Sequence, residues 1–366
     1  MMRSAVVGGA GRDPRIMSHS PSTSSAPPSS FIVLKGYHMG SKWFAEIFSA
    51  LPGGAFHFEY EHCLRKEARE RPDAASTHLV APASATLSYL RHGCHCASSC
   101  LGRCNATENS HIAPCLATGV SFGALGAAYI AHVRAVLHHE PRVAIVAHVR
   151  TNHVKHALSF LRTSCDGEYN HAYKVAGRSG TSMTRASRLH VPPPLLLLRA
   201  VHAAQENQRI LSTAKSVSSD SRGVAHVMVY ERLQSHLAAE LTTLLVAIGV
   251  PRAAANAAVS ATAPIEDAKA ASEKMVKAGA ENLAEGLSNF AEVEAYLSTS
   301  RLPCLLSMLR AEGPQSFAVG ACDAEVETLS CNEERCSQWK ELLAVKAARP
   351  RGWALNATEC GAPPSG

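Results

Sequence analysis

An α/β fold with a central parallel sheet is the architecture that this sequence of 366 residues predicts. Residues 31–34, 143–149 and 227–230 are apolar runs of the length of buried strands, and each is followed by a segment with helical spacing of apolar residues. Strands that alternate with helices favour a parallel sheet with helices on both faces. We therefore expect a single three-layer α/β/α domain.

Helices are expected where apolar residues recur every three or four positions. This spacing predicts helices over residues 43–51, 122–138, 195–214, 237–248 and 290–297, and a further helix that begins near Asn152. Gly249 and Pro251 supply a stop signal for the helix over 237–248. The first predicted strand, at 31–34, and the first predicted helix, at 43–51, are joined by a turn that contains Gly36 and Gly40.

The two ends of the chain differ from this core in composition. Residues 20–30 contain only Ser, Pro, Thr and Ala, so we expect a disordered leader over residues 1–30. The domain is expected over residues 31–312, with a Cys/His-rich insertion at 63–115. A cysteine-containing tail is expected to follow over residues 313–366.

Composition limits the classes of partner. The chain is 46% hydrophobic and 18% charged, with a formal net charge of +6 and 19 histidines, which suits a globular protein with a mildly basic surface. Such a surface favours an anionic cofactor or an acidic polymer, but the chain lacks the Lys/Arg runs of a dedicated nucleic-acid binder. Nucleic acid is therefore not expected as a partner.

Cysteines and sequons indicate an oxidising compartment. Nine of the 12 cysteines lie in two clusters, at residues 94–115 and 322–360, and Asn-Ala-Thr sequons begin beside them at Asn105 and Asn356. No stretch reaches the roughly 18 apolar residues that span a bilayer, and residues 1–30 do not resemble a signal peptide. We expect the Golgi lumen, with the cytoplasm as the alternative, and membrane association only if an anchor is missing from this chain.

The turn over residues 34–44 has the features of a phosphate cradle. Backbone N–H groups around Gly40 would converge at a helix N-terminus, where unpaired amides and the helix dipole attract anions, and Lys42 adds a mobile positive charge. The turn is not a Walker motif, because the interval from Gly36 to Gly40 is one residue short and Trp43 replaces the Ser/Thr that would hold magnesium. An enzyme that hydrolyses nucleoside triphosphates is therefore not expected.

Two later segments supply further residues that could belong to the same phosphate site. Arg150 follows the apolar run at 143–149, and Ser159 lies on the next helix, so that both could grip one phosphate, Arg by a bidentate fork and Ser through its hydroxyl. The run at 227–230 leads into a polar turn that begins Tyr230-Glu231. Ligands of open parallel sheets bind at the carboxyl ends of the strands, where all three segments are expected.

In this order the motifs resemble the sulfotransferase superfamily that uses 3′-phosphoadenosine 5′-phosphosulfate (PAPS) as the sulfuryl donor. The resemblance covers residues 31 to 310, and residues 289–293 are similar to a late segment of nodulation-type and glycolipid-type members. It implies that the 5′-phosphosulfate is bound by Gly40, Ser41 and Lys42, and that the 3′-phosphate is bound by Arg150 and Ser159. Lys35 and Trp43 are further expected donor-binding residues.

The sequence departs from the family pattern at two places. His38 stands where the family loop usually carries Arg or Lys, so the cation that bridges to the sulfuryl group is Lys42, protonated His38 or Lys35. The interval from Arg150 to Ser159 is nine residues rather than the commoner eight, a variant that resembles the nodulation-type group.

A base is needed to remove the proton of the acceptor hydroxyl. Glu59 is the candidate, because it follows Gly40 by nineteen residues, as a Glu does in the tyrosylprotein sulfotransferases that this loop resembles. Glu61 and His57 are neighbours that could serve instead, and the two glutamates could also be surface residues of a strand.

The Cys/His cluster over residues 92–115 has three possible uses. Disulfides are favoured over free thiols and over zinc, because its Cys-x-Cys-x3-Cys-x3-Cys spacing does not match paired CxxC units. The chemistry of the resembled superfamily needs no metal, and no metal is expected.

The sequence thus predicts a sulfotransferase that moves a sulfuryl group from PAPS to a hydroxyl of a carbohydrate and releases the nucleotide product PAP. Glu59, Lys42 and His38 are the predicted catalytic residues. Three alternatives stay open: a sulfotransferase for protein tyrosine or a small alcohol, an inactive relative that binds PAP, and a nucleotide kinase. The sequence does not indicate an oligomeric state.

Overall fold

The computed structural model describes residues 29–36, 39–64, 83–92, 115–124, 126–165, 189–218, 223–261 and 282–330. Five parallel strands form one sheet in the order β2-β3-β1-β4-β5. Their bounds are β1 Ser29–Lys35, β2 Gly54–His57, β3 Ala117–Gly123, β4 Ala144–Val149 and β5 Val224–Val229. The predicted α/β fold with a central parallel sheet is confirmed.

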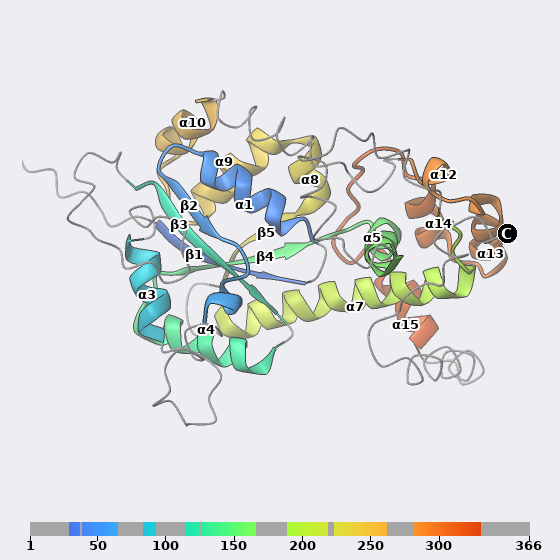
Figure 1. Cartoon of the computed structure of the whole chain (residues 1–366), viewed down its shortest axis with the longest axis horizontal. Helices are drawn as coiled ribbons and strands as arrows, with labels where there is room; N and C mark the ends of the chain where they lie inside the picture. Colours follow the sequence, from blue (N-terminus) through green and yellow to red (C-terminus); the bar gives the residue numbers. More distant parts are fainter. Residues whose placement is uncertain are drawn as a thin grey trace, which may run out of the picture.

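Helices cover both faces of the sheet and complete the three layers (Figure 1). One face carries α1 (Ser41–Ala50), α8 (Tyr230–Ser235), α9 (Leu237–Ala247) and α10 (Arg252–Ser260). The other face carries α3 (Ala83–His92), α4 (Ala127–His139) and α7 (Pro193–Ser218). Among the described residues, no helix is both long and apolar enough to cross a membrane.

A second group of helices packs around one end of α7, beyond the carboxyl edge of the sheet (Figure 1). It consists of α5 (His153–Cys165), α12 (Leu283–Gly286), α13 (Phe290–Thr299), α14 (Pro303–Arg310) and α15 (Asp323–Ser330). The apolar cluster of this group includes Cys322, Val326 and Leu329, so the first part of the predicted tail packs on the domain. The predicted domain boundaries otherwise stay predictions.

Strand β1 lies in the middle of the sheet and is apolar on both sides. Phe31 and Val33 pack in the cluster under α1, whereas Ile32 and Leu34 pack in the cluster under α4 and α7. The chain passes from β1 to the edge strand β2 on one side of it, whereas the later strands β4 and β5 lie on its other side, so the strand order reverses next to β1. A crevice for a ligand is expected at the carboxyl end of such a switch point.

Strand β3 corrects the prediction that a helix begins at Phe122. Residues Ala117–Gly123 form a buried strand between β1 and β2, and α4 begins only at Ala127. The strand lacks an apolar run because a Cβ at Gly119 would overlap the ring of Phe31, so the close packing of β1 requires glycine there. A smaller difference concerns Tyr230, which begins α8 instead of ending β5.

Candidate functional site

The turn between β1 and α1 ends in a left-handed glycine at the start of the helix. Gly40 has φ +70°, and its carbonyl accepts the amide of Phe44 at 3.0 Å. Gly40 has no side chain with which to cap α1, and the start of a helix is a place where backbone amides and the helix dipole attract an anion. His38 lies outside the described residues, as do the side chains of Ser41 and Lys42, so their predicted roles stay predictions.

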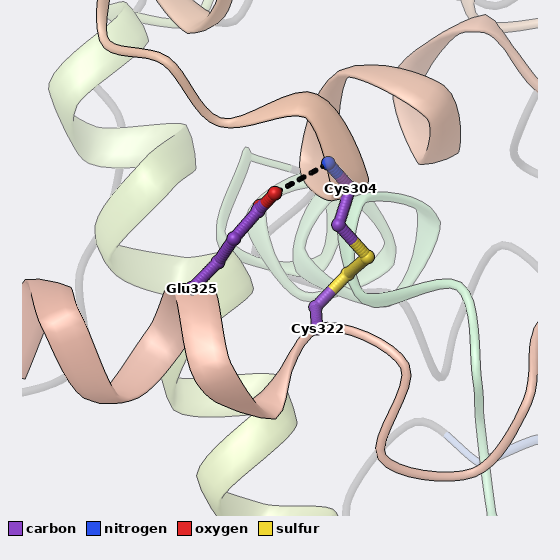
Figure 2. Close-up of side chains that lie close together, drawn as sticks. All are labelled: Cys304, Cys322 and Glu325. Atoms are coloured by element: carbon purple, nitrogen blue, oxygen red, sulfur yellow. Dashed lines mark hydrogen bonds between the residues drawn. A yellow bond between two sulfur atoms is a disulfide. The ribbon is translucent and has the colours of Figure 1, made fainter.

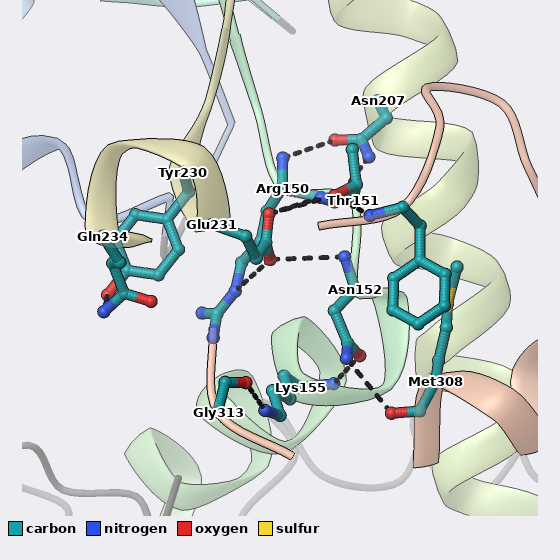
Figure 3. A network of polar contacts seen from close by, with 11 residues as sticks. Arg150, Thr151, Asn152, Lys155, Asn207, Tyr230, Glu231, Gln234, Met308 and Gly313 are labelled. Atoms are coloured by element: carbon teal, nitrogen blue, oxygen red, sulfur yellow. Dashed lines mark hydrogen bonds and ion pairs between the residues drawn. The ribbon is translucent and has the colours of Figure 1, made fainter. Parts of the chain in front are cut away.

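Tyr230 joins this turn to Arg150. A Cβ at Gly40 would overlap the Tyr230 ring, which also lies edge-on to Trp43 with ring centroids 6.0 Å apart. The guanidinium carbon of Arg150 lies 4.8 Å from the centroid of the same ring, within the range of a cation–π interaction (Figure 3). Predicted donor-binding residues from β1–α1 and from the end of β4 therefore meet on one aromatic ring.

The buried carboxylate of Glu231 fixes the chain that carries Arg150. It accepts hydrogen bonds from the amide and hydroxyl of Thr151, at 2.9 and 3.2 Å, and from the amide of Asn152 at 3.2 Å (Figure 3). Arg150 Nε lies 3.4 Å from Glu231 Oε1, and the glutamate side chain is only 2% exposed. The charge of Glu231 is thus compensated by a cation and by amides at the start of α5.

The chain around Arg150 is also held from α7 and from the segment between α14 and α15. Asn207 Nδ2 donates to the Arg150 carbonyl at 2.8 Å, and the Phe317 amide donates to Thr151 Oγ1 at 3.1 Å. Asn152 caps α5 by accepting the amide of Lys155 at 2.9 Å, while the Lys155 ammonium donates to a carbonyl of the α14–α15 segment (Figure 3). Four parts of the chain therefore converge on the end of β4.

A charged pair lies at the carboxyl ends of β1 and β2. Lys35 is buried, and its Nζ lies 3.3 Å from Glu59 Oε1 and 4.8 Å from the ring centroid of Phe58. Glu59 has φ +50°, a left-handed conformation that is strained for a residue with a Cβ, and its amide donates to Ser121 Oγ at 2.8 Å. Glu59 is thus held in place beside a predicted donor-binding cation.

The two alternative bases lie in different surroundings. Glu61 is buried, which raises the pKa of its carboxyl, and its Oε2 has no hydrogen-bond partner. His57 is tied to the Phe58 carbonyl at 2.9 Å and to Cys63 Sγ at 3.1 Å, and burial lowers its pKa. Two glutamates near Lys35 therefore remain candidates for the base: Glu59, which is partly exposed, and Glu61, which is buried.

His148 on β4 is fully buried, and neither ring nitrogen has a hydrogen-bond partner. Burial, reinforced by the positive charges of Lys35 and Arg150, lowers the pKa of His148 to about 3, so the ring is neutral at physiological pH. No role was predicted for this histidine, which lies inside the apolar run at 143–149.

Ser159 and Glu231 show the limits of motif reasoning. Ser159 lies in the second turn of α5, half-buried, and its pairing with Arg150 on one phosphate stays a prediction. The anchoring role of Glu231 was not predicted, although its place directly after an apolar strand was a signal that it could be buried.

A group of potential metal ligands lies away from this site. Cys304, Cys322 and Glu325 lie close together, but the two sulfurs form a disulfide and so offer no thiolate (Figure 2). Glu325 instead accepts the Cys304 amide at 2.6 Å at the start of α14. Cys322 thus pairs with a cysteine outside the two predicted clusters, while most of the 92–115 cluster and both sequons lie outside the described residues.

Comparisons with known proteins identify few similarities. No family model matches the chain, and no curated protein matches it. Among solved structures, a sulfotransferase from Alicyclobacillus acidocaldarius aligns with a TM-score of 0.32 and 13% identity, over 62% of this chain and 83% of that chain. A likeness of this degree assigns no function, so any functional conclusion depends on the geometry of the chain's own residues.

Proposed function

We propose that the chain is a PAPS-dependent sulfotransferase that transfers a sulfuryl group to a hydroxyl of a carbohydrate. The observation that carries the proposal is the meeting of two anion-binding features on Tyr230: the uncapped start of α1 after Gly40 and the guanidinium of Arg150. A nucleotide with phosphate groups at both its 5′ and 3′ positions needs two such features. The carbohydrate acceptor is supported only by the sequence resemblance.

In this proposal the chain binds the donor along the carboxyl ends of β1, β4 and β5. The first amides of α1, with Ser41 and Lys42, hold the 5′-phosphosulfate, and Arg150 and Ser159 hold the 3′-phosphate. The rings of Trp43 and Tyr230 offer aromatic surface for the base. Lys35 and His38 remain the other candidates for the cation at the sulfuryl group.

The transfer itself requires little covalent chemistry from the protein. The acceptor oxygen forms a bond to sulfur while the bond from sulfur to the 5′-phosphate oxygen breaks, and the nucleotide leaves as PAP. Glu59 takes the proton of the hydroxyl, and one of the three candidate cations stabilises charge on the sulfuryl oxygens. Of these, Lys35 lies beside Glu59. The base and the cation lie 3.3 Å apart, and Glu59 has a left-handed backbone of the kind that is found at functional sites.

Arg150→Ala is expected to weaken PAP binding at least tenfold, a loss of about 1.4 kcal/mol, because a charge-assisted contact to phosphate disappears. Arg142→Ala, which removes a mostly exposed cation paired with Glu140, is the control and should leave binding unchanged. Calorimetric titration with PAP measures both, and transfer of radiolabelled sulfate to a panel of glycans, phenols and tyrosine peptides identifies the acceptor. Wild-type protein that does not bind PAP, or that turns over Mg-ATP instead, would contradict the proposal.

Glu59→Gln is expected to lower the transfer rate by a factor of about 100 to 10,000, because the amide cannot accept the proton, with PAP affinity unchanged. Glu61→Gln is the matched control on the neighbouring buried carboxyl and should keep most of the rate. Initial rates of sulfate transfer at saturating PAPS measure the difference. If the loss followed Glu61 instead, the base would be the buried glutamate.

A further inference from the structure

His148 is a buried polar side chain without a use in the fold. Its ring is 0% exposed, and both Nδ1 and Nε2 lack hydrogen-bond partners. A neutral imidazole has one N–H donor and one acceptor nitrogen, and leaving such groups unpaired inside a protein destabilises the folded state. Buried polar groups are nearly always paired, so an unpaired one needs an explanation.

The position of His148 is on the α1 side of the sheet, near its carboxyl edge. Val146 packs in the cluster under α1 and Ala147 in the opposite cluster, so alternation along β4 turns His148 toward α1. Its ring centroid lies 6.2 Å from that of Phe44, which belongs to the first turn of α1. The side chain therefore lies at the same end of α1 as the uncapped amides.

Two cations flank His148 within the sheet. Lys35 is its direct neighbour on β1, and Arg150 follows two residues later, just after the end of β4. Their positive charges disfavour protonation of the ring and favour an anion close to it. The ring therefore presents a neutral N–H between two cations, which is a suitable donor for a phosphate or sulfate oxygen.

We propose that His148 is a ligand-binding residue whose ring N–H donates a hydrogen bond to an anionic oxygen of the nucleotide's 5′ group at the start of α1. The inference rests on the proposed function, since it takes PAPS or PAP as the ligand. It explains why a destabilising group is kept: the hydrogen bond is made only in the complex. It also adds a donor near a loop where His38 replaces the usual cation.

The test compares two substitutions at His148 in the full-length protein. His148→Leu removes both polar nitrogens, and His148→Gln keeps an amide donor of similar reach. We expect His148→Leu to unfold at a higher temperature than wild type and to bind PAP about tenfold to a hundredfold more weakly. His148→Gln should recover part of the affinity.

His132→Leu is the matched control, because His132 on α4 is also buried but has a partner. Its Nε2 lies 2.8 Å from Oγ1 of Thr86 on α3. That variant should be less stable than wild type and should bind PAP normally. PAP binding by wild type together with unchanged binding by His148→Leu would overturn this inference alone. Absence of PAP binding by wild type would overturn the proposed function and the inference with it.

Discussion

Glu231→Ala is expected to lower the free energy of unfolding by about 3 to 5 kcal/mol, the cost of breaking a buried ion pair from one side. Three donors from Thr151 and Asn152 lose their acceptor, and Arg150 loses the carboxylate 3.4 Å from its Nε. The start of α5 and the guanidinium should therefore become less well ordered together. PAP affinity should fall as well, because Arg150 is no longer oriented.

Glu294→Ala is the control for this experiment, because it removes a glutamate from a surface ion pair. Glu294 Oε1 lies 2.7 Å from Arg310 Nε, but the two side chains are 33% and 57% exposed. Exposed pairs contribute about 0 to 1 kcal/mol, so this variant should unfold nearly like wild type. Urea denaturation of both variants measures the difference. A loss below about 1 kcal/mol for Glu231→Ala would show that the network does not hold the site.

Gly40→Ala is expected to abolish measurable PAP binding at concentrations that saturate wild type. The new Cβ has two effects, because φ +70° is strained by about 1 to 2 kcal/mol for alanine and because the methyl group overlaps the Tyr230 ring. Displacement of the ring would separate the start of α1 from Arg150.

Gly223→Ala separates the two effects. Gly223 has φ +82°, but nothing lies within 4 Å of a Cβ there, so this substitution adds backbone strain without a clash. It should lower the free energy of unfolding by about 1 to 2 kcal/mol and leave PAP binding intact. Titration with PAP and thermal unfolding of both variants test this. Equal binding by Gly40→Ala and Gly223→Ala would mean that Tyr230 does not need its present position.

The elements found from sequence are those whose residues carry their own structural signal. Strands β1 and β4 are apolar because helices cover both of their faces, and the stop residues Gly249 and Pro251 follow closely after α9 ends at Ala247. Strand β3 carries no such signal. Its buried Thr118, Gly119 and Ser121 are selected by neighbours, the glycine by the ring of Phe31 and the serine by the amide of Glu59.

The candidate site shows the same division. Gly40 and Arg150 could be proposed from local motifs, because a turn before a helix and a cation after a strand are visible in a few residues. The partners that position them come from distant parts of the chain: Glu231 is 80 residues from Thr151, and Asn207 is 57 residues from Arg150. A single sequence contains no local pattern that joins such residues.

The contact between Phe317 and Thr151 has a consequence for the order of events during synthesis. The two residues are 166 positions apart, and the disulfide between Cys304 and Cys322 encloses the segment that makes the contact. Since a chain emerges from the ribosome N-terminus first, the sheet can assemble before this segment exists. The support around Arg150 is then completed only after residue 317 has been made.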